Sequence, residues 1–387
     1  MRPNNAHPVP TTSIQIHQSF SSDLTDGEGM LLLRAGEKAS AELLRELARR
    51  DCQTVFLHGP PPADSSDPPR HRATLDRSFR DAALLIQNAI WRIQTQQQIA
   101  AREFIEPIIR LEGIISDDSC LILDFVMTTG AQRESPIAMR SAQLSMLVQL
   151  LASEMGFPRP MCRLAARAAM LSDLSLLQLD DPRQLLQELT CGVVSPANAL
   201  RYNAHPEESA RMIEESIPDA HPLESVLIRQ SHEHSDGTGF PRGLTGRVLH
   251  PLSRIINLVD VFLMLTETNA DGRRLAPADA LAYLILHSLY GTFDLEVVRA
   301  LVRVAAVYPV GTDVVLTDQR LARVIRSDDR HYLDPIVRID GTGEELKLHY
   351  APQKIAAPAI DSGTVRLPKA RLDERLWDIV VREEQAS

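Results

Sequence analysis

The chain has 387 residues, 44% of them hydrophobic and 24% charged, and its formal net charge is −10. This length is enough for one large core and a smaller satellite domain, and the negative charge argues against general binding to DNA, RNA or anionic membranes. The four cysteines are scattered without a CxxC pair, so neither a zinc knuckle nor a disulfide framework is expected.

The N-terminal residues, MRPNNAHPVPTT, lack the basic and apolar segments of a signal peptide. No uncharged apolar stretch approaches the length of about 18 residues that indicates a transmembrane helix. The best candidate, residues 297–310, is interrupted by Arg299 and Arg303. We therefore expect a cytoplasmic protein without a membrane span.

Residues 1–58 have the pattern of a small α/β module. Strand-like residues 13–16 and 54–57 flank a segment from Ala39 to Arg50 in which apolar residues recur at helical spacing. The next segment, residues 59–72, begins with GPPPADSSDPPR. Its proline, serine and aspartate content predicts an extended linker without a core.

The rest of the chain is mostly helical in pattern. Residues 73–130 predict a helical connector, which is either a helix pair for interaction or signalling or a set of helices packed on the next domain. Residues 131–308 are helix-forming segments separated by loops, and residues 309–387 contain short β-type runs between turns. The predicted fold class is mainly α, with a small N-terminal α/β module and a small β-rich C-terminal extension.

The stretch most informative about chemistry is SHEHSDGTGFPRGLTGRVLHPLSRIINLVDVF, residues 231–262. Polar groups cluster there, where an amphipathic helix is expected to end: His232, Glu233, His234 and Asp236. Such a cluster can bind a metal ion, but it can equally be a solvated helix end.

Two aspartates stand in otherwise apolar helical segments. Asp260 lies within RIINLVDVF, and Asp173 lies within AARAAMLSDLSLLQL. A buried carboxylate is costly unless a cation, a metal or strong donors meet it. Either aspartate alone could lie on the polar stripe of its helix, but the two together, in this order around a histidine cluster, favour a site.

These features resemble the HD-GYP family of the HD phosphohydrolase superfamily, whose members are cyclic di-GMP phosphodiesterases. The resemblance covers residues 131–308 and rests on an LxD element, an isolated His-Pro pair, a His-Glu pair, DGxGFPxGL and RIINLVDVF. The Gly-Tyr-Pro signature appears here as Gly-Phe-Pro. The residues of this GYP-type motif are Asp236, Gly237, Gly239, Phe240, Pro241 and Gly243.

The resemblance implies an HD-type helical bundle that binds two or three iron or manganese ions. A metal-bridging hydroxide then attacks the phosphodiester. The positions that match retained ligands of the family are Asp173, His205, His232 and Asp260.

Other family positions have changed. By the same resemblance, Ser172 and Ser231 stand where the family has histidines, Leu176 stands where it has a lysine, and Arg140 aligns by spacing with a further histidine. The chain has no histidine between His71 and His205, so a shift of alignment restores neither upstream ligand. We expect no binuclear site, and either no metal or at most one divalent ion, iron or manganese by resemblance.

The family's basic phosphate-binding segment corresponds to TETNADGRR, in which Arg273 and Arg274 are the candidate phosphate ligands or, alternatively, solvated residues at a helix start. The prediction is a catalytically impaired regulatory or protein-binding module in cyclic di-GMP signalling. The candidate partners are a diguanylate cyclase or another signalling protein, cyclic di-GMP itself, and a second copy of the chain. The alternatives are a residual one-metal phosphodiesterase and a purely structural helical scaffold.

Overall fold

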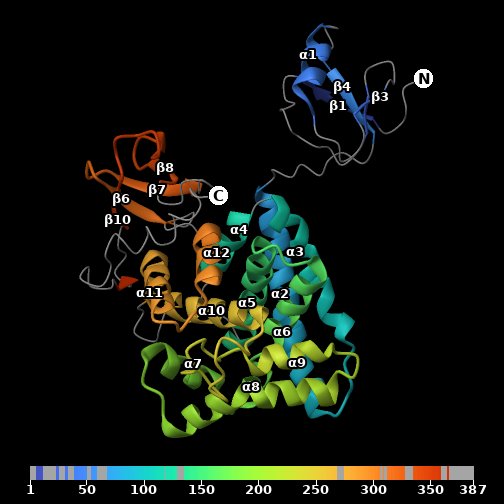
Figure 1. Cartoon of the computed structure of the whole chain (residues 1–387), viewed down its shortest axis with the longest axis vertical. Coiled ribbons are helices and arrows are strands. Elements are labelled where there is room, and N and C mark those ends of the chain that lie inside the picture. The colour runs from blue at the N-terminus through green and yellow to red at the C-terminus, as the bar shows by residue number, and fades with distance from the viewer. Residues whose placement is uncertain are drawn as a thin grey trace. The chain divides into compact units, whose positions relative to one another are not determined.

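The computed structural model describes residues 6–11, 23–25, 31–33, 39–49, 54–58, 68–117, 119–128, 135–267, 274–305, 308, 312–326, 334–358 and 364–365. The chain divides into two compact units, residues 1–67 and residues 68–387 (Figure 1).

In its described residues, the first unit contains a four-stranded antiparallel sheet and one helix. The sheet has the order β1-β4-β2-β3 and is formed by β1 (Ala6–Pro10), β2 (Asp23–Thr25), β3 (Leu31–Leu33) and β4 (Thr54–His58). Leu47 on α1 (Ala41–Arg49) shares a small core with Leu24 and Val55. The expected strand at residues 54–57 and the helix are therefore confirmed. The expected strand at 13–16 lies outside the described residues, and β1 was not predicted.

The second unit is dominated by helices. They are α2 (Pro68–Gln94), α3 (Ile105–Asp117), α4 (Ser119–Thr128), α5 (Pro136–Glu154), α6 (Arg159–Leu171), α7 (Pro182–Cys191), α8 (Pro196–Ser216), α9 (Pro222–Arg229), α10 (Pro251–Thr266), α11 (Pro277–Leu289) and α12 (Leu295–Ala305), with short 3₁₀ helices η2 (Ala101–Phe104) and η3 (Leu174–Gln178). Many begin with proline, whose fixed φ suits a first helical turn that has no intrahelical partner for its N–H. The mainly α fold class is confirmed.

The start of α2 corrects the predicted linker. Residues 68–72 are helical rather than extended, because Pro68 and Pro69 can occupy the first turn of a helix without losing a hydrogen bond. Residues 59–67 lie outside the described residues. Phe79 and Ile86 of α2 are buried in the same core as α5 and α6, so α2 packs on the bundle.

Short strands follow the helices. The sheet order is β10-β6-β7-β8-β9, all antiparallel, from β6 (Asp313–Leu316), β7 (Leu321–Arg326), β8 (Ile336–Ile339), β9 (Glu345–Lys347) and β10 (Ile355–Pro358). Alternate side chains, including Val314, Val324 and Val337, form its own core. A parallel pair joins β5 (Arg274–Leu275) to β11 (Thr364–Val365). Among the described residues, no helix is both long enough and apolar enough to cross a membrane.

Candidate metal centre

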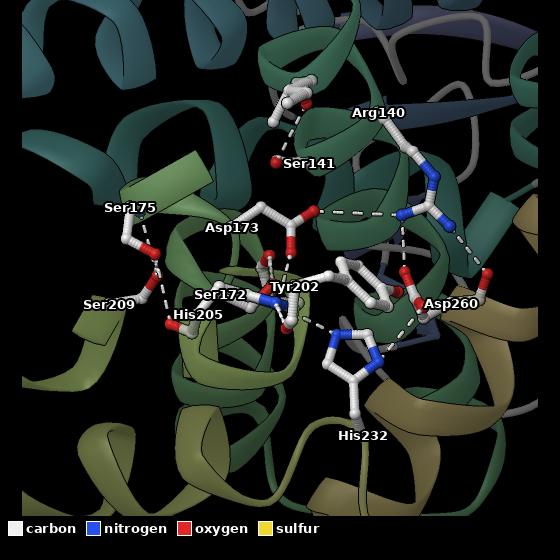
Figure 2. Close-up of polar contacts among 12 residues, drawn as sticks. Arg140, Ser141, Ser172, Asp173, Ser175, Tyr202, His205, Ser209, His232 and Asp260 are labelled. Atoms are coloured by element: carbon white, nitrogen blue, oxygen red, sulfur yellow. Dashed lines mark hydrogen bonds and ion pairs between the residues drawn. The ribbon is translucent and has the colours of Figure 1, made fainter. Parts of the chain in front are cut away.

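Five elements of the bundle bring the candidate side chains together (Figure 2). Arg140 comes from α5, His205 from α8 and Asp260 from α10. Asp173 lies between the end of α6 and the start of η3, and His232 follows the end of α9. All five side chains are buried. The sequence placed His232 within the helix, but α9 ends at Arg229, and the histidine lies in the turn after it.

Three of the four predicted ligands form a compact cluster. One ligand atom from each of Asp173, His205 and His232 lies within 4.8 Å of the other two. The two Nε2 atoms of the histidines are 3.1 Å apart, and His205 Nε2 is 3.4 Å from Asp173 Oδ1. Asp260 is adjacent, with Oδ2 3.6 Å from His232 Nδ1, but it is engaged elsewhere.

The backbone fixes how His205 faces the cluster. Its Nδ1 lies 2.5 Å from the carbonyl oxygen of Tyr202 and donates a hydrogen bond to it. In a neutral imidazole, that bond leaves Nε2 as the atom with the free lone pair. The same arrangement, one nitrogen on a carbonyl and the other free, is the one in which histidine ligates metals.

The fourth predicted ligand, Asp260, is paired with the arginine. Arg140 Nη1 is 2.5 Å from Asp260 Oδ1, and Nη2 donates to the Asp260 carbonyl oxygen at 2.9 Å. The same Nη1 is 3.9 Å from Asp173 Oδ2. Arg140 Nε is 3.4 Å from Glu267 Oε2, within ion-pair distance although not aligned for a hydrogen bond. The guanidinium therefore lies among three carboxylates, those of Asp260, Asp173 and Glu267.

Burial and neighbouring charge set the ionisation of the cluster. Burial alone would raise the pKa of Asp173, but the adjacent His205 side chain and the charge of Arg140 lower that pKa to about 2. Burial lowers the pKa of His232 to about 4, against the opposing effect of Asp260. Burial opposes the charge of Arg140, yet the carboxylates of Asp260 and Glu267 raise its pKa. Arg140 therefore stays charged, and His232 is neutral at pH 7.

The positions where the resemblance implied lost groups are also buried. The hydroxyl of Ser172 donates to the carbonyl oxygen of Ala169, one turn back in its own helix. The hydroxyl of Ser231 has no hydrogen-bond partner among the described residues. Leu176 packs with Ile137 and Leu185 in a small apolar cluster. None of these side chains supplies an imidazole or an amine to the site.

Sequence reasoning missed Tyr202 and Glu267. Tyr202 precedes His205 by three residues on α8, and its ring lies 4.9 Å from the His205 ring and 5.4 Å from the His232 ring, centroid to centroid. That i, i+3 spacing was the available signal. Glu267 follows α10 immediately, and burial raises its pKa. Its role depends on the tertiary position of Arg140, which no local pattern indicates.

A small cavity of about 20 Å³ lies beside Arg140, Asp173 and Tyr202. This volume suffices for roughly one water molecule. The remaining lining side chains are apolar: Ile137, Leu176, Leu185, Leu186, Leu189 and Met264. Leucines of α7 therefore border the side of the cluster that faces this cavity.

The GYP-type loop is held by Glu233, whose carboxylate accepts hydrogen bonds from the backbone N–H groups of Arg242 at 2.7 Å and Leu244 at 2.8 Å. Gly239 lies so close to the preceding turn that a Cβ there would be 2.3 Å from the backbone nitrogen of His234. Asp236, predicted as part of the polar cluster, instead accepts hydrogen bonds from Thr238 and Thr292. The loop is thus held by hydrogen bonds from within the chain.

No described contact connects either candidate phosphate-binding arginine with the cluster of metal ligands. Arg273 lies outside the described residues. Arg274 is the first residue of β5, where it is half-buried and paired in register with Thr364. The phosphate-binding role of these two arginines stays a prediction.

The donor set fits one metal ion. Around a tetrahedral ion with metal–nitrogen distances of about 2.0–2.1 Å, the ligand atoms are roughly 3.3 Å apart. The two spacings of 3.1 and 3.4 Å that involve His205 Nε2 agree with that value. Asp173, His205 and His232 would hold the ion, which would supply Lewis acidity when bound. A second ion between Asp173 and Asp260 does not fit, because Arg140 Nη1 already lies there.

The chain is similar to known proteins over part of its length. Residues 126–297 match the family model described as HD domain. The cyclic di-GMP phosphodiesterase PA4108 of Pseudomonas aeruginosa is 29% identical over 201 residues, which are 52% of this chain and 47% of that protein. The match therefore spans about half the length of the relative. Among solved structures, Bd1817, an HDG"Y"P protein from Bdellovibrio bacteriovorus, has 16% sequence identity and a TM-score of 0.47, covering 77% of this chain and 98% of the other.

Residues 126–297 are thus similar to HD domains, and the predicted resemblance to the HD-GYP family is confirmed.

Proposed function

We propose that this chain is a catalytically impaired HD-GYP-type protein of cyclic di-GMP signalling that acts as a regulatory or protein-binding module. Cyclic di-GMP is the proposed nucleotide because a relative of this chain is named a cyclic di-GMP phosphodiesterase. We infer impaired catalysis from the small number of metal ligands in this chain. We infer the binding role from the GYP-type loop, which lies next to these ligands.

The observation that carries the proposal is the size of the ligand set. Asp173, His205 and His232 offer one ligand atom each, enough for one ion and a water molecule. Phosphodiester hydrolysis by paired metals needs a second ion, so that both the attacking and the leaving oxygens are stabilised. The Ser172 hydroxyl is bonded to its own helix and cannot extend the set.

The loop supports the binding role. Pro241, Arg242 and Gly243 are exposed at its tip, while Glu233 beneath them is buried and accepts two backbone hydrogen bonds from the loop. An exposed loop whose conformation is held by hydrogen bonds within the chain can serve as a contact surface for a protein partner. A diguanylate cyclase is the partner that the HD-GYP resemblance suggests.

A second candidate function is residual phosphodiesterase activity with one ion. The observation that favours it is that the three ligands remain within 4.8 Å of one another rather than being dispersed or filled by apolar groups. It requires one bound ion per chain and loss of activity in His232→Ala.

The test is an anaerobic purification followed by a measurement of bound iron and manganese and by a steady-state assay of pGpG and GMP release from cyclic di-GMP. We expect the wild-type chain to release no more pGpG and GMP than His232→Ala does, at any measured metal content. Release by the wild-type chain that disappears in His232→Ala and in Asp260→Ala would support the residual phosphodiesterase and refute the proposal.

A further inference from the structure

Arg140 connects two helices of the bundle through one buried side chain. It extends from α5, and both of its terminal nitrogens bind the same residue of α10, Nη1 through the carboxylate of Asp260 and Nη2 through its backbone carbonyl. This two-point contact fixes the plane of the guanidinium. The arginine is 4% exposed, so water contributes little to neutralising the groups around it.

The orientation of the guanidinium places one nitrogen between two carboxylates. Nη1 is 2.5 Å from Asp260 Oδ1 and 3.9 Å from Asp173 Oδ2. Figure 2 shows the side chain pointing into the space between the two aspartates, with His232 on the far side of Asp260. The other oxygen of Asp173 faces His205 in the three-ligand cluster. Asp173 therefore shares its two oxygens between the cluster and the arginine.

Two buried carboxylates that face one another need a positive charge between them. A divalent ion would meet this need in a site with two ions, with each carboxylate contributing an oxygen. Here a guanidinium meets it, and guanidinium groups do not lose their proton in proteins. The charge is therefore present at every pH and at every metal concentration.

We infer that Arg140 is a built-in cation that occupies the position of a second metal ion between Asp173 and Asp260 and thereby restricts the site to the single ion of Asp173, His205 and His232. The inference rests on the proposed function, because it explains why the cluster holds no more than one ion. It also implies that the α5–α10 contact is held by the chain itself and does not depend on metal.

The direct test uses the full chain and Mn²⁺ as the probe. Arg140→Met removes the charge at similar length, and Arg140→Lys keeps the charge while losing the planar fork. Equilibrium dialysis counts Mn²⁺ per chain, and thermal unfolding is followed in EDTA and in excess Mn²⁺. We expect Arg140→Met to bind one more Mn²⁺ than the wild type and to gain a larger increase in midpoint from Mn²⁺. Arg140→Lys should keep the wild-type count.

A second pair of variants tests the same inference if Arg140→Met does not fold. Ser172→His with Ser231→His places imidazoles at the two buried serines while Arg140 stays, and we expect the wild-type number of ions. Adding Arg140→His should raise the count by one. Electron paramagnetic resonance should then show a coupled Mn²⁺ pair in the triple variant and isolated Mn²⁺ in the double variant.

The inference is overturned by a folded Arg140→Met with the wild-type count, by an equal gain in Arg140→Lys, or by an extra ion in the double variant. These readouts are independent of turnover. Hydrolysis by the wild type would refute the proposed function and leave the count of ions to decide the role of Arg140.

Discussion

The ring of Phe240 lies stacked on the imidazole of His232, with ring centroids 4.8 Å apart and an angle of 7° between the planes. The backbone N–H of Phe240 also donates to the carbonyl oxygen of His232 at 3.1 Å. The signature aromatic of the loop is therefore packed directly on a candidate ligand. This contact joins the loop to the site.

Replacing Phe240 tests how much this stack holds the loop. Phe240→Ala should lower the free energy of unfolding by about 1–2 kcal/mol, since it removes a half-buried ring and its contact with an aromatic neighbour. Phe240→Tyr keeps the ring and should change stability by less than about 0.5 kcal/mol. Urea unfolding of both variants measures the difference. Equal stability of Phe240→Ala and the wild type would show that the stack contributes nothing.

Gly239 is a sharper test of the loop conformation. A Cβ at this position would meet the His234 nitrogen at 2.3 Å and the His232 carbonyl oxygen at 2.4 Å, both of them backbone atoms that cannot move aside. Gly239→Ala should therefore cost at least about 2 kcal/mol. The matched control is Gly113→Ala on α3, where a Cβ meets nothing within 4 Å. Because alanine is the better helix former, the control should gain about 0.5–1 kcal/mol. Comparable losses in both variants would contradict the loop geometry.

The pair of Arg140 and Asp260 calls for a double-mutant cycle. Asp260→Leu leaves a buried guanidinium without its nearest partner, and Arg140→Met leaves the carboxylate unpaired, so each should cost about 3–5 kcal/mol. Together they remove both charges, and the double variant should lose clearly less than the sum. Chemical denaturation in EDTA provides the values. Strict additivity would mean that the two side chains do not interact.

Acid stability should depend on Glu188, near the end of α7. Hydrogen bonds from the Ser195 backbone N–H and from the Asn198 amide lower the pKa of Glu188 to about 2, from an ordinary value of 4.5. A carboxyl with a lowered pKa in the fold stabilises above its unfolded pKa, and this stabilisation is lost as pH falls from about 4.5 toward 2. Glu188→Gln should flatten the decline of the urea midpoint in that window. An identical decline in wild type and variant would contradict this role.

The sequence could predict the part of the site that rests on local patterns. Asp173 was expected from a carboxylate in an apolar segment, and the chain indeed buries it beside His205 and His232. The contact of Asp260 with Arg140 could not be predicted, because it joins α5 to α10 across 120 positions of sequence. Only packing of the bundle brings the guanidinium within reach.

The fold was predictable to a similar degree. Helical spacing predicted the bundle, and short β-type runs between turns predicted the strands of the C-terminal sheet, such as β7, whose burial alternates in the structure. The start of α2 at Pro68 was not predicted, because proline favours both linkers and first helical turns. Tertiary packing of α2 on α5 decides between these two conformations.

Single-turnover hydrolysis tests the impaired site most directly. The purified full chain, loaded anaerobically with Fe²⁺ or Mn²⁺ and held in molar excess over cyclic di-GMP, is sampled over hours for pGpG and GMP. We expect the cyclic dinucleotide to remain intact, as we also expect with His232→Ala, because Asp173, His205 and His232 offer ligands for one ion and Arg140 Nη1 lies between Asp173 and Asp260. Conversion of the dinucleotide by the wild type, and not by His232→Ala, would contradict that conclusion.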